Sequence, residues 1–372
     1  MPSQAQTTIE QLVKPLGITV NGAQPWDIKV HDERFYSRVL WGGSLALGES
    51  YMDGWWNADK LDEFFFRILA SDVRKKVRDA WPSILAAAGA RIFNPQKGRR
   101  AFTIGEAHYD LGNDLYTAML DKRMAYTCGY WKDAADLDAA QEAKLDIVCR
   151  KLKLQAGQTV LDIGCGWGSF LQFASERYGV RGVGVTVSAE QMKLAQKRCA
   201  GLPIEIRLQD YRDIDGSFDH VVSLGMFEHV GYKNYDTFMQ VVRRVLKDDG
   251  LFLLHTIGGR RSVKSFDPWI GKYIFPNSML PSIAQIARAA EGSFVIEDLH
   301  NFGADYDKTL MAWYENFEKA WSTLQSKYDE RFHRMWRYYL LACAGSFRAR
   351  MNQLWQIVLS KNGVPGGYGS VR

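Results

Sequence analysis

The stretch TVLDIGCGWGSFLQFA, residues 159–174, decides the fold of this chain. Its apolar start, residues 159–163, leads into Gly164, Gly166 and Gly168, and the residues after them follow a helical pattern. Small residues let the backbone come close to a ligand, and the N-terminus of a helix offers free N–H groups. The stretch therefore predicts a strand, a ligand-binding glycine loop and a helix, in that order.

Strand and helix patterns alternate on both sides of the glycine loop. Strands are expected at 159–163, 181–186, 204–208, 219–225 and 250–256, with later strands at 294–300 and 354–360. Helices are expected at 138–153, 168–178, 188–200 and 234–246, and two long ones at about 307–327 and 330–349. This alternation predicts an α/β fold with a doubly wound, Rossmann-like parallel sheet.

The chain of 372 residues is long enough for two unequal domains. Residues 1–95 read as a small, mostly helical N-terminal domain, with helices broken at glycines. The turn formers and basic residues of NPQKGRR, 94–100, predict a linker at 96–105. Residues 106–372 then form the catalytic domain, which carries an insertion at 259–291.

Composition excludes several classes of protein. The start MPSQAQTTIEQ is polar and no apolar run reaches the roughly 20 residues that span a bilayer, so a cytoplasmic protein is expected. The five cysteines lie far apart without a CxxC pair, which argues against a metal site and a disulfide framework. The basic residues are not interleaved with a recognition motif, so no nucleic-acid partner is expected.

The residues around the glycine loop favour one nucleoside ligand over another. Asp162 would repel a pyrophosphate but suits an amino group, and the spacing G-x-G-x-G differs from the dinucleotide pattern. Thr186 stands where an acidic residue commonly binds the ribose of NAD. S-adenosyl-L-methionine is therefore preferred as the cofactor, while an NAD-dependent dehydrogenase and a purely structural turn stay open as alternatives.

Several separate motifs resemble those of the cyclopropane-fatty-acyl-phospholipid synthases, to which the mycolic acid cyclopropane synthases are related. The motifs are LDIGCGWGS, GVTVSAEQ, GMFEHVG, LLHTIG, HNFGADYDKTLMAWYENF and FRARMNQLWQ, and the likeness covers nearly the whole chain. The resemblance implies a methyltransferase sheet that binds S-adenosyl-L-methionine. The cofactor-binding candidates are Tyr126, Thr127, Asp162, Gly164, Gly166, Gly168, Thr186, Gln191, Gln209, Asp210 and Tyr211.

The resemblance also implies a reaction, in which a methylene group is added to a cis double bond of an acyl chain in a membrane phospholipid. The methyl of the donor joins the alkene, a carbocation forms, and loss of a proton closes the ring. A bound bicarbonate ion is the implied base, and the insertion is expected to hold the acyl chain. The residues implied to bind that ion are Cys128, Glu228, His255, Ile257 and Tyr306, and Cys343 is a further catalytic candidate.

The pattern of the residues agrees with such a site but leaves alternatives open. Glu228 follows the fourth strand and His255 closes the fifth, and ligands bind at this edge of parallel sheets. An isolated histidine in an apolar strand is also typical of a satisfied core group, and Tyr306, Cys128 and Cys343 are equally compatible with core positions. A carboxylate would repel bicarbonate unless the site carries the right protons.

A soluble enzyme that acts on phospholipid needs peripheral contact with the inner face of the cell membrane. The basic clusters 73–78 and 97–100 and the apolar stretch 81–93 are candidates for that contact, although an ordinary solvated face is the other reading. A homodimer is also expected. Two other functions stay open: a lipid methyltransferase that gives a methyl-branched or hydroxymethyl product, and a non-catalytic lipid-binding protein.

Overall fold

The computed structural model describes residues 2–71 and 112–372, which form two compact units. The described part of the first unit is 2–71, 265–276 and 306–352, and that of the second is 112–264, 277–305 and 353–372. The contacts thus group two segments, 265–276 and 306–352, with the N-terminal residues, whereas the sequence placed both in the catalytic domain. The expected linker at 96–105 and the basic clusters lie outside the described residues.

The second unit contains, among its described residues, a seven-stranded sheet of order β5-β4-β3-β6-β7-β9-β8. Strands β3 to β7 pair in parallel, which confirms the predicted α/β doubly wound architecture. The strands are β3 (Thr159–Ile163), β4 (Arg181–Thr186), β5 (Ile204–Leu208), β6 (Phe218–Leu224), β7 (Leu246–Gly259), β8 (Val295–Asn301) and β9 (Asn352–Ser360). The first three have the bounds that the sequence predicts.

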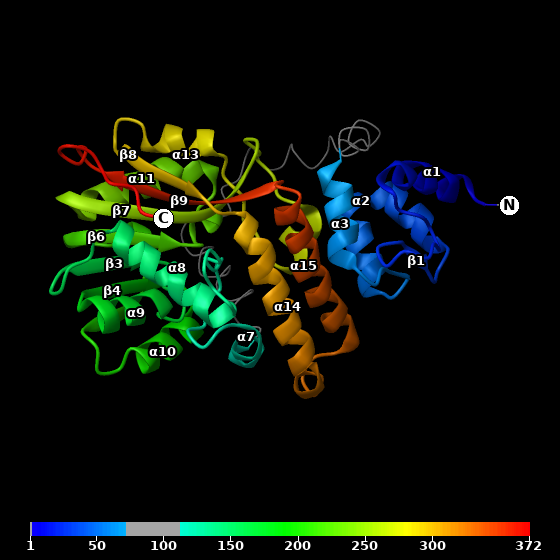
Figure 1. The fold of residues 1–372 in the computed structure, drawn as a ribbon, viewed down its shortest axis with the longest axis horizontal. Coiled ribbons are helices and arrows are strands. Elements are labelled where there is room, and N and C mark those ends of the chain that lie inside the picture. The colour runs from blue at the N-terminus through cyan, green and yellow to red at the C-terminus, as the bar shows by residue number, and fades with distance from the viewer. Residues whose placement is uncertain (1, 72–111) are drawn as a thin grey trace. The chain divides into compact units, whose positions relative to one another are not determined.

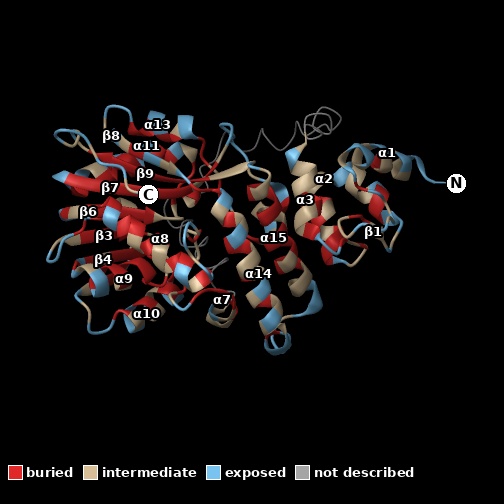
Figure 2. Cartoon of the chain, viewed as in Figure 1, coloured by how far each residue is buried: buried red, intermediate tan, exposed pale blue. Residues whose placement is uncertain are grey.

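Helices cover both faces of this sheet (Figure 1). Alternate residues of a strand point to opposite faces, so Val160 packs in one hydrophobic cluster and Leu161 in the other. The cluster of Val160 includes side chains of α8, α9 and α10, and that of Leu161 includes side chains of α11 and α13. Figure 2 shows the result, a buried sheet between helices with exposed outer faces. The helices are α7 (Asn113–Met119), α8 (Leu137–Lys151), α9 (Ser169–Tyr178), α10 (Ala189–Arg198), α11 (Tyr235–Val245) and α13 (Ile283–Ala290).

Two features of the sheet depart from the predicted pattern. Strands β8 and β9 are antiparallel to each other, which makes the sheet mixed at one edge. Strand β7 is longer than the predicted 250–256, because a register shift between Phe218 and His220 lets its first residues pair with the start of β6. The sequence pattern predicts neither feature, because a short apolar run is compatible with parallel and with antiparallel pairing and does not show how far the pairing extends.

The first unit is built from helices and a short antiparallel pair, β1 (Lys29–Val30) with β2 (Trp56–Asn57). Helix α2 bends at Gly43, where φ is 59°, and ends before Gly54, so both expected glycine breaks are present. Positive φ at these points suits glycine, which has no Cβ. The helices are α1 (Gln4–Val13), α2 (Arg34–Met52), α3 (Leu61–Ala70), α12 (Pro268–Tyr273), α14 (Ala304–Leu324, in this unit from Tyr306) and α15 (Glu330–Arg348).

Aromatic packing explains why the later helices join the N-terminal ones. Tyr338 of α15 lies 5.1 Å from Phe65 of α3 and 4.4 Å from Trp269 of α12, measured between ring centroids. Helix α15 approaches α3 closely at Gly345, where an added Cβ would stand 2.6 Å from the carbonyl oxygen of Asp62. Buried aromatic pairs contribute area and edge-to-face attraction, so these segments form one core although they are far apart in sequence.

Among the described residues, we find no helix that combines the length and the apolar character needed to cross a bilayer.

Candidate active site

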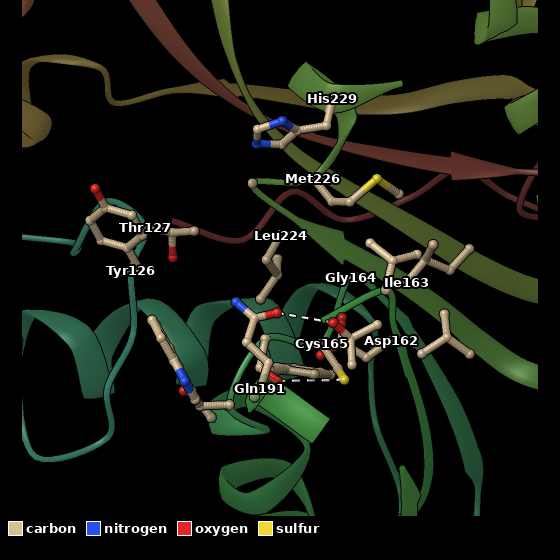
Figure 3. A pocket seen from close by; sticks show the side chains of 18 of the residues that line it. Tyr126, Thr127, Asp162, Ile163, Gly164, Cys165, Gln191, Leu224, Met226 and His229 are labelled. Atoms are coloured by element: carbon tan, nitrogen blue, oxygen red, sulfur yellow. Dashed lines mark hydrogen bonds between the residues drawn. The ribbon is translucent and has the colours of Figure 1, made fainter. Parts of the chain in front are cut away.

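A pocket opens in the second unit at the carboxyl ends of β3, β4, β5 and β6 (Figure 3). The chain runs from β3 outward through β4 to β5 and then crosses back to β6 on the other side of β3. At such a switch point the two connections leave in opposite directions, and a crevice remains between them. Ten of the eleven cofactor-binding candidates line this pocket: Tyr126, Thr127, Asp162, Gly164, Gly166, Thr186, Gln191, Gln209, Asp210 and Tyr211.

The three glycines of the loop after β3 have different environments. All have positive φ, 85° at Gly164, 54° at Gly166 and 80° at Gly168. A Cβ on Gly164 would stand 2.6 Å from Met226, and one on Gly168 would stand 2.9 Å from the sulfur of Cys199. A Cβ on Gly166 would have no described atom within 4 Å. Gly166 thus leaves open space in the pocket, whereas Gly168 caps α9 and does not line the pocket.

Asp162 is the buried acid of the pocket. It is 1% exposed, and its Oδ1 has no hydrogen-bond partner among the described residues. Burial raises the pKa of Asp162 to about 7, and Lys144 partly opposes this shift. A buried carboxylate without a partner is costly, so the arrangement suits a ligand that brings a positive charge or a donor.

Thr186 and Gln191 form a hydrogen-bonded pair on the next strand and helix. The Thr186 hydroxyl donates to Gln191 Oε1 at 2.9 Å and accepts from the backbone N–H of Ser188 at 3.2 Å. Because its oxygen is used in this way, the Gln191 side chain offers the pocket its NH₂ group. An amide donor can serve hydroxyl groups of a ribose, as an acidic residue does elsewhere.

The residues after β5 already have protein partners. The side-chain nitrogen of Gln209 donates to the carbonyl of Asp213 at 2.7 Å, and Asp210 Oδ2 pairs with Arg212 at 2.8 Å. The Tyr211 hydroxyl is buried without a partner among the described residues. Gln209 therefore still has its second amide N–H and its Oε1 to offer a ligand, and Asp210 has its remaining lone pairs.

The loop between α7 and α8 forms another wall, with Tyr126 and Thr127 on it (Figure 3). Helix α8 holds this loop: Lys144 Nζ donates to Thr127 Oγ1 at 2.7 Å, and the Gln141 amide donates to the Thr127 carbonyl at 2.7 Å. The sequence reading missed Lys144, which also lines the pocket. The sequence could have indicated that Lys144 is buried, because it shares a helical face with the apolar Leu145 and with Gln141, where a solvent-exposed lysine is not expected.

Glu228 lies just after β6, in a short 3₁₀ helix formed by Phe227–His229. It is 6% exposed, and its Oε1 accepts the backbone N–H of Ile257 at 2.6 Å. Its Oε2 has no partner among the described residues, and burial raises the pKa of Glu228 to about 7. The N–H of Ile257 is thus used to orient Glu228, whereas the sequence reading expected Ile257 to contact an anion itself.

His255 lies on β7 opposite Leu224 of β6 and is 1% exposed. Its Nδ1 lies 3.3 Å from the side-chain nitrogen of Gln356, and its Nε2 has no partner among the described residues. Burial, and then the charges of Lys144 and Lys151, hold the pKa of His255 well below its usual value. With the Gln356 amide in this orientation, its nitrogen donates to Nδ1 and the neutral ring carries its hydrogen on Nε2.

The remaining catalytic candidates have the following surroundings. Cys128 is fully buried and close enough to Lys144 to affect the lysine electrostatically. Tyr306 and Cys343 belong to the first unit, where Tyr306 packs 4.5 Å from the ring of Phe347. Burial raises the pKa of the Cys343 thiol to about 12, so a thiolate nucleophile is not available at neutral pH.

The family model for mycolic acid cyclopropane synthetase matches residues 96–357, which is most of the chain. The chain belongs to this family. It is 56% identical over 357 residues to the cyclopropane-fatty-acyl-phospholipid synthase of Escherichia coli (strain K12), covering 96% of this chain and 93% of that protein.

Two further members of the family are informative. The tuberculostearic acid methyltransferase of Mycobacterium tuberculosis is 32% identical, over 87% of this chain and 80% of that one. The solved structure of the mycolic acid cyclopropane synthase CmaA1 in complex with SAH and CTAB has a TM-score of 0.65 and 33% identity, over 70% of this chain and 98% of that chain. The chain is therefore an enzyme with the fold of S-adenosylmethionine-dependent methyltransferases, and NAD-dependent dehydrogenation is excluded.

Proposed function

We propose that this enzyme transfers a methylene group from S-adenosyl-L-methionine to a cis double bond in an acyl chain of a membrane phospholipid and so forms a cyclopropane ring. The relative at 56% identity bears the name of that activity. The observation within the molecule that supports the proposal is a pair of buried polar atoms, Glu228 Oε2 and His255 Nε2, which have no hydrogen-bond partner among the described residues. Glu228 follows β6, whose end borders the pocket, and His255 lies on the neighbouring strand β7.

The alkene is a weak nucleophile, so the electrophilic methyl must be held in line with it and water must be kept out. In our proposal the ten pocket-lining candidates hold the donor. Attack of the alkene breaks the bond between sulfur and methyl, leaves S-adenosylhomocysteine, and places a positive charge on the second alkene carbon. Loss of a proton from the added methyl then supplies the electron pair that closes the ring.

In our proposal, Glu228 and His255 together bind a small anion. His255 offers an N–H at Nε2, and Glu228, with a pKa of about 7, offers an O–H at Oε2 in its protonated form. Its Oε1 already accepts from Ile257, so the proton belongs on the other oxygen. In this proposal the carboxyl group of Glu228 binds the anion in its protonated form, which avoids the repulsion between a carboxylate and an anion. A bound bicarbonate would supply the base that takes up the proton.

Cys128 and Tyr306 remain proposed contacts of that anion, and Cys343 remains a proposed catalytic residue of undefined role. Ile257 is proposed to act through Glu228. Gly168 is proposed to shape the loop that holds the cofactor.

The product can be tested with pure protein, vesicles of cis-unsaturated phospholipid and donor labelled with deuterium in the methyl group. A cyclopropane retains two of the three labelled hydrogens and loses the alkene signal, as measured by mass spectrometry and proton NMR. A methyl-branched chain that keeps all three labelled hydrogens and still contains a double bond, because the cation loses a proton from the chain, would instead support the methyltransferase hypothesis, to which the name of the 32% identical relative points. Absence of any label in lipid, with the donor still bound, would favour the non-catalytic lipid-binding reading.

The anion site has its own test, in bicarbonate-depleted and bicarbonate-supplemented buffer. We expect Glu228→Ala to lower the rate of ring formation by about 100-fold or more, the usual cost of removing one donor from a charge-stabilising site. Glu228→Gln keeps an N–H donor and should lose less. Glu205→Gln, a surface carboxylate paired with Arg207, is the matched control. Full activity of Glu228→Ala would refute the proposed anion site but would leave the assignment of the cofactor pocket unaffected.

Peripheral contact with the inner face of the cell membrane and a homodimer also belong to this proposal. A phospholipid substrate requires the first, and the net charge of +5 is compatible with anionic headgroups. Sedimentation with anionic vesicles tests the membrane contact, and sedimentation velocity without vesicles tests the dimer. Because a phospholipid substrate requires contact with the membrane, we also propose that the N-terminal domain docks on lipid while the other domain carries out catalysis.

A further inference from the structure

Two buried ionisable side chains of opposite sign line the cofactor pocket. Lys144 and Asp162 are each 1% exposed, and both border the same space. They come from different elements, Lys144 from α8 and Asp162 from β3. Burying one charge is costly, and burying two is sustained where each charge has a partner or a function.

Lys144 makes one hydrogen bond among the described residues, from Nζ to Thr127 Oγ1 at 2.7 Å. A protonated lysine can only donate hydrogen bonds, so the Thr127 hydroxyl oxygen accepts this one. The hydroxyl hydrogen of Thr127 is then free to point elsewhere. Gln141, one turn earlier on α8, donates to the carbonyls of Ala125 and Thr127 at 3.2 Å and 2.7 Å. Helix α8 therefore fixes both the backbone and the hydroxyl of Thr127.

Asp162 supplies the complementary charge. Its Oδ1 is buried without a hydrogen-bond partner among the described residues. Figure 3 shows Thr127 on one wall of the pocket, and Asp162 with Gln191 on another. Burial lowers the pKa of Lys144 to about 8, which the charge of Asp121 opposes more than that of Asp162, and burial raises the pKa of Asp162 to about 7, which Lys144 opposes.

We propose that Lys144 is a positioning residue that, together with Asp162, makes the pocket complementary to a zwitterion. The zwitterion is the amino-acid end of S-adenosylmethionine. The Thr127 hydroxyl, oriented by Lys144, donates to the ligand carboxylate, and Asp162 accepts from the ligand ammonium group. The inference depends on the pocket being the S-adenosylmethionine site. Beyond the proposed function, the inference predicts that the pocket binds ligands with the amino-acid end more tightly than adenosine thioethers that lack it.

Calorimetric titration of S-adenosylhomocysteine and 5′-methylthioadenosine tests the proposal, because the second ligand lacks the amino-acid end. For Lys144→Met we expect the Kd of S-adenosylhomocysteine to rise about 10-fold or more, as for loss of a charge-assisted hydrogen bond. The Kd of 5′-methylthioadenosine should stay within about twofold. Lys151→Met is the matched control, because Lys151 is an equally buried lysine on α8 that does not line the pocket.

Three outcomes would overturn the inference or its basis. An unchanged affinity for S-adenosylhomocysteine in Lys144→Met would refute the role of Lys144. An equal loss for both ligands would show that the lysine only supports the fold of the pocket. If the unchanged protein binds neither ligand, the assignment of the pocket itself fails. Should Lys144→Met not fold, Thr127→Val removes the hydroxyl alone and must give the same selective loss.

Discussion

Two pairs of acidic side chains, one pair in each unit, have different surroundings. In the helical unit, Asp62 and Asp307 are partly exposed and pair with the guanidinium of Arg348 at 2.7 Å and 2.9 Å. In the α/β unit, Asp162 and Glu228 are buried, and each has an oxygen without a hydrogen-bond partner among the described residues. The first pair contributes to holding helices together. The second pair lowers stability and leaves polar atoms available, which is typical of functional sites.

The strongest test of this contrast is the loss of the buried carboxylate in Asp162→Asn. We expect the Kd of S-adenosylhomocysteine to rise about 100-fold, because a buried charge interaction with the ligand ammonium is lost. Calorimetry measures this change. Asp219→Asn is the control, since Asp219 lies outside the pocket and pairs with Lys247 at 2.6 Å. Equal affinities for Asp162→Asn and the unchanged protein would mean that Asp162 is only a buried structural acid.

The helical unit can be perturbed without touching ligand-binding groups by Gly345→Ala. The new Cβ would stand 2.6 Å from the Asp62 carbonyl oxygen and 2.8 Å from Phe65, so we expect the free energy of unfolding to fall by about 1–3 kcal/mol. Urea denaturation measures the loss. The affinity of folded protein for S-adenosylhomocysteine should not change, because none of the described residues of this unit lines the cofactor pocket.

Gly271→Ala is the matched control for that substitution. Gly271 lies in α12 of the same unit, and a Cβ there would have no described atom within 4 Å. Alanine should therefore stabilise the protein by up to about 1 kcal/mol through helix propensity. If both substitutions gave the same change, the close approach of α15 to α3 would not be a determinant of stability.

A smaller effect is expected at His220, a buried group whose two ring nitrogens both have partners, and it concerns the pH dependence of stability. In His220, Nδ1 accepts the N–H of Leu251 at 3.3 Å, and Nε2 lies 3.3 Å from Gln158 Oε1. Both nitrogens are thus used by the neutral ring, and burial lowers the pKa of His220 to about 4. The stability from this group is present above its unfolded pKa of about 6.5 and is lost as the pH falls toward 4.

We expect the lost stability to reach roughly 1 kcal/mol at pH 5.5 for this group alone. His220→Asn keeps an acceptor near the Leu251 N–H but does not titrate there, so its unfolding free energy should depend less steeply on pH between 6.5 and 4. Thermal or urea denaturation at several pH values gives the two slopes. Parallel slopes would show that His220 does not contribute to acid sensitivity.

Much of the α/β unit was predictable because its information is local. Strands β3, β4 and β5 were predicted with their observed bounds, since short apolar runs between glycines and amphipathic helices have few other readings. Placing Glu228 just after β6 and His255 on β7 also needed only their position in the pattern, but β7 runs on to Gly259, so His255 does not end its strand as predicted. The direction of β8 relative to β9 and the full length of β7 were not predictable, because both depend on pairing with distant strands.

The sequence by itself determined the strand and helix periods, the glycine loop and the polar residues that follow the strands, because each of these depends on neighbours within a few turns. Only the tertiary structure decided that two segments late in the chain pack with the N-terminal helices, that Gly166 alone of the three loop glycines has open space beside it, and that Lys144 is buried against Thr127. Burial and hydrogen-bond partners arise from contacts between residues that are remote in sequence. Which polar atoms are left without a partner in the interior therefore becomes visible only when the chain is folded.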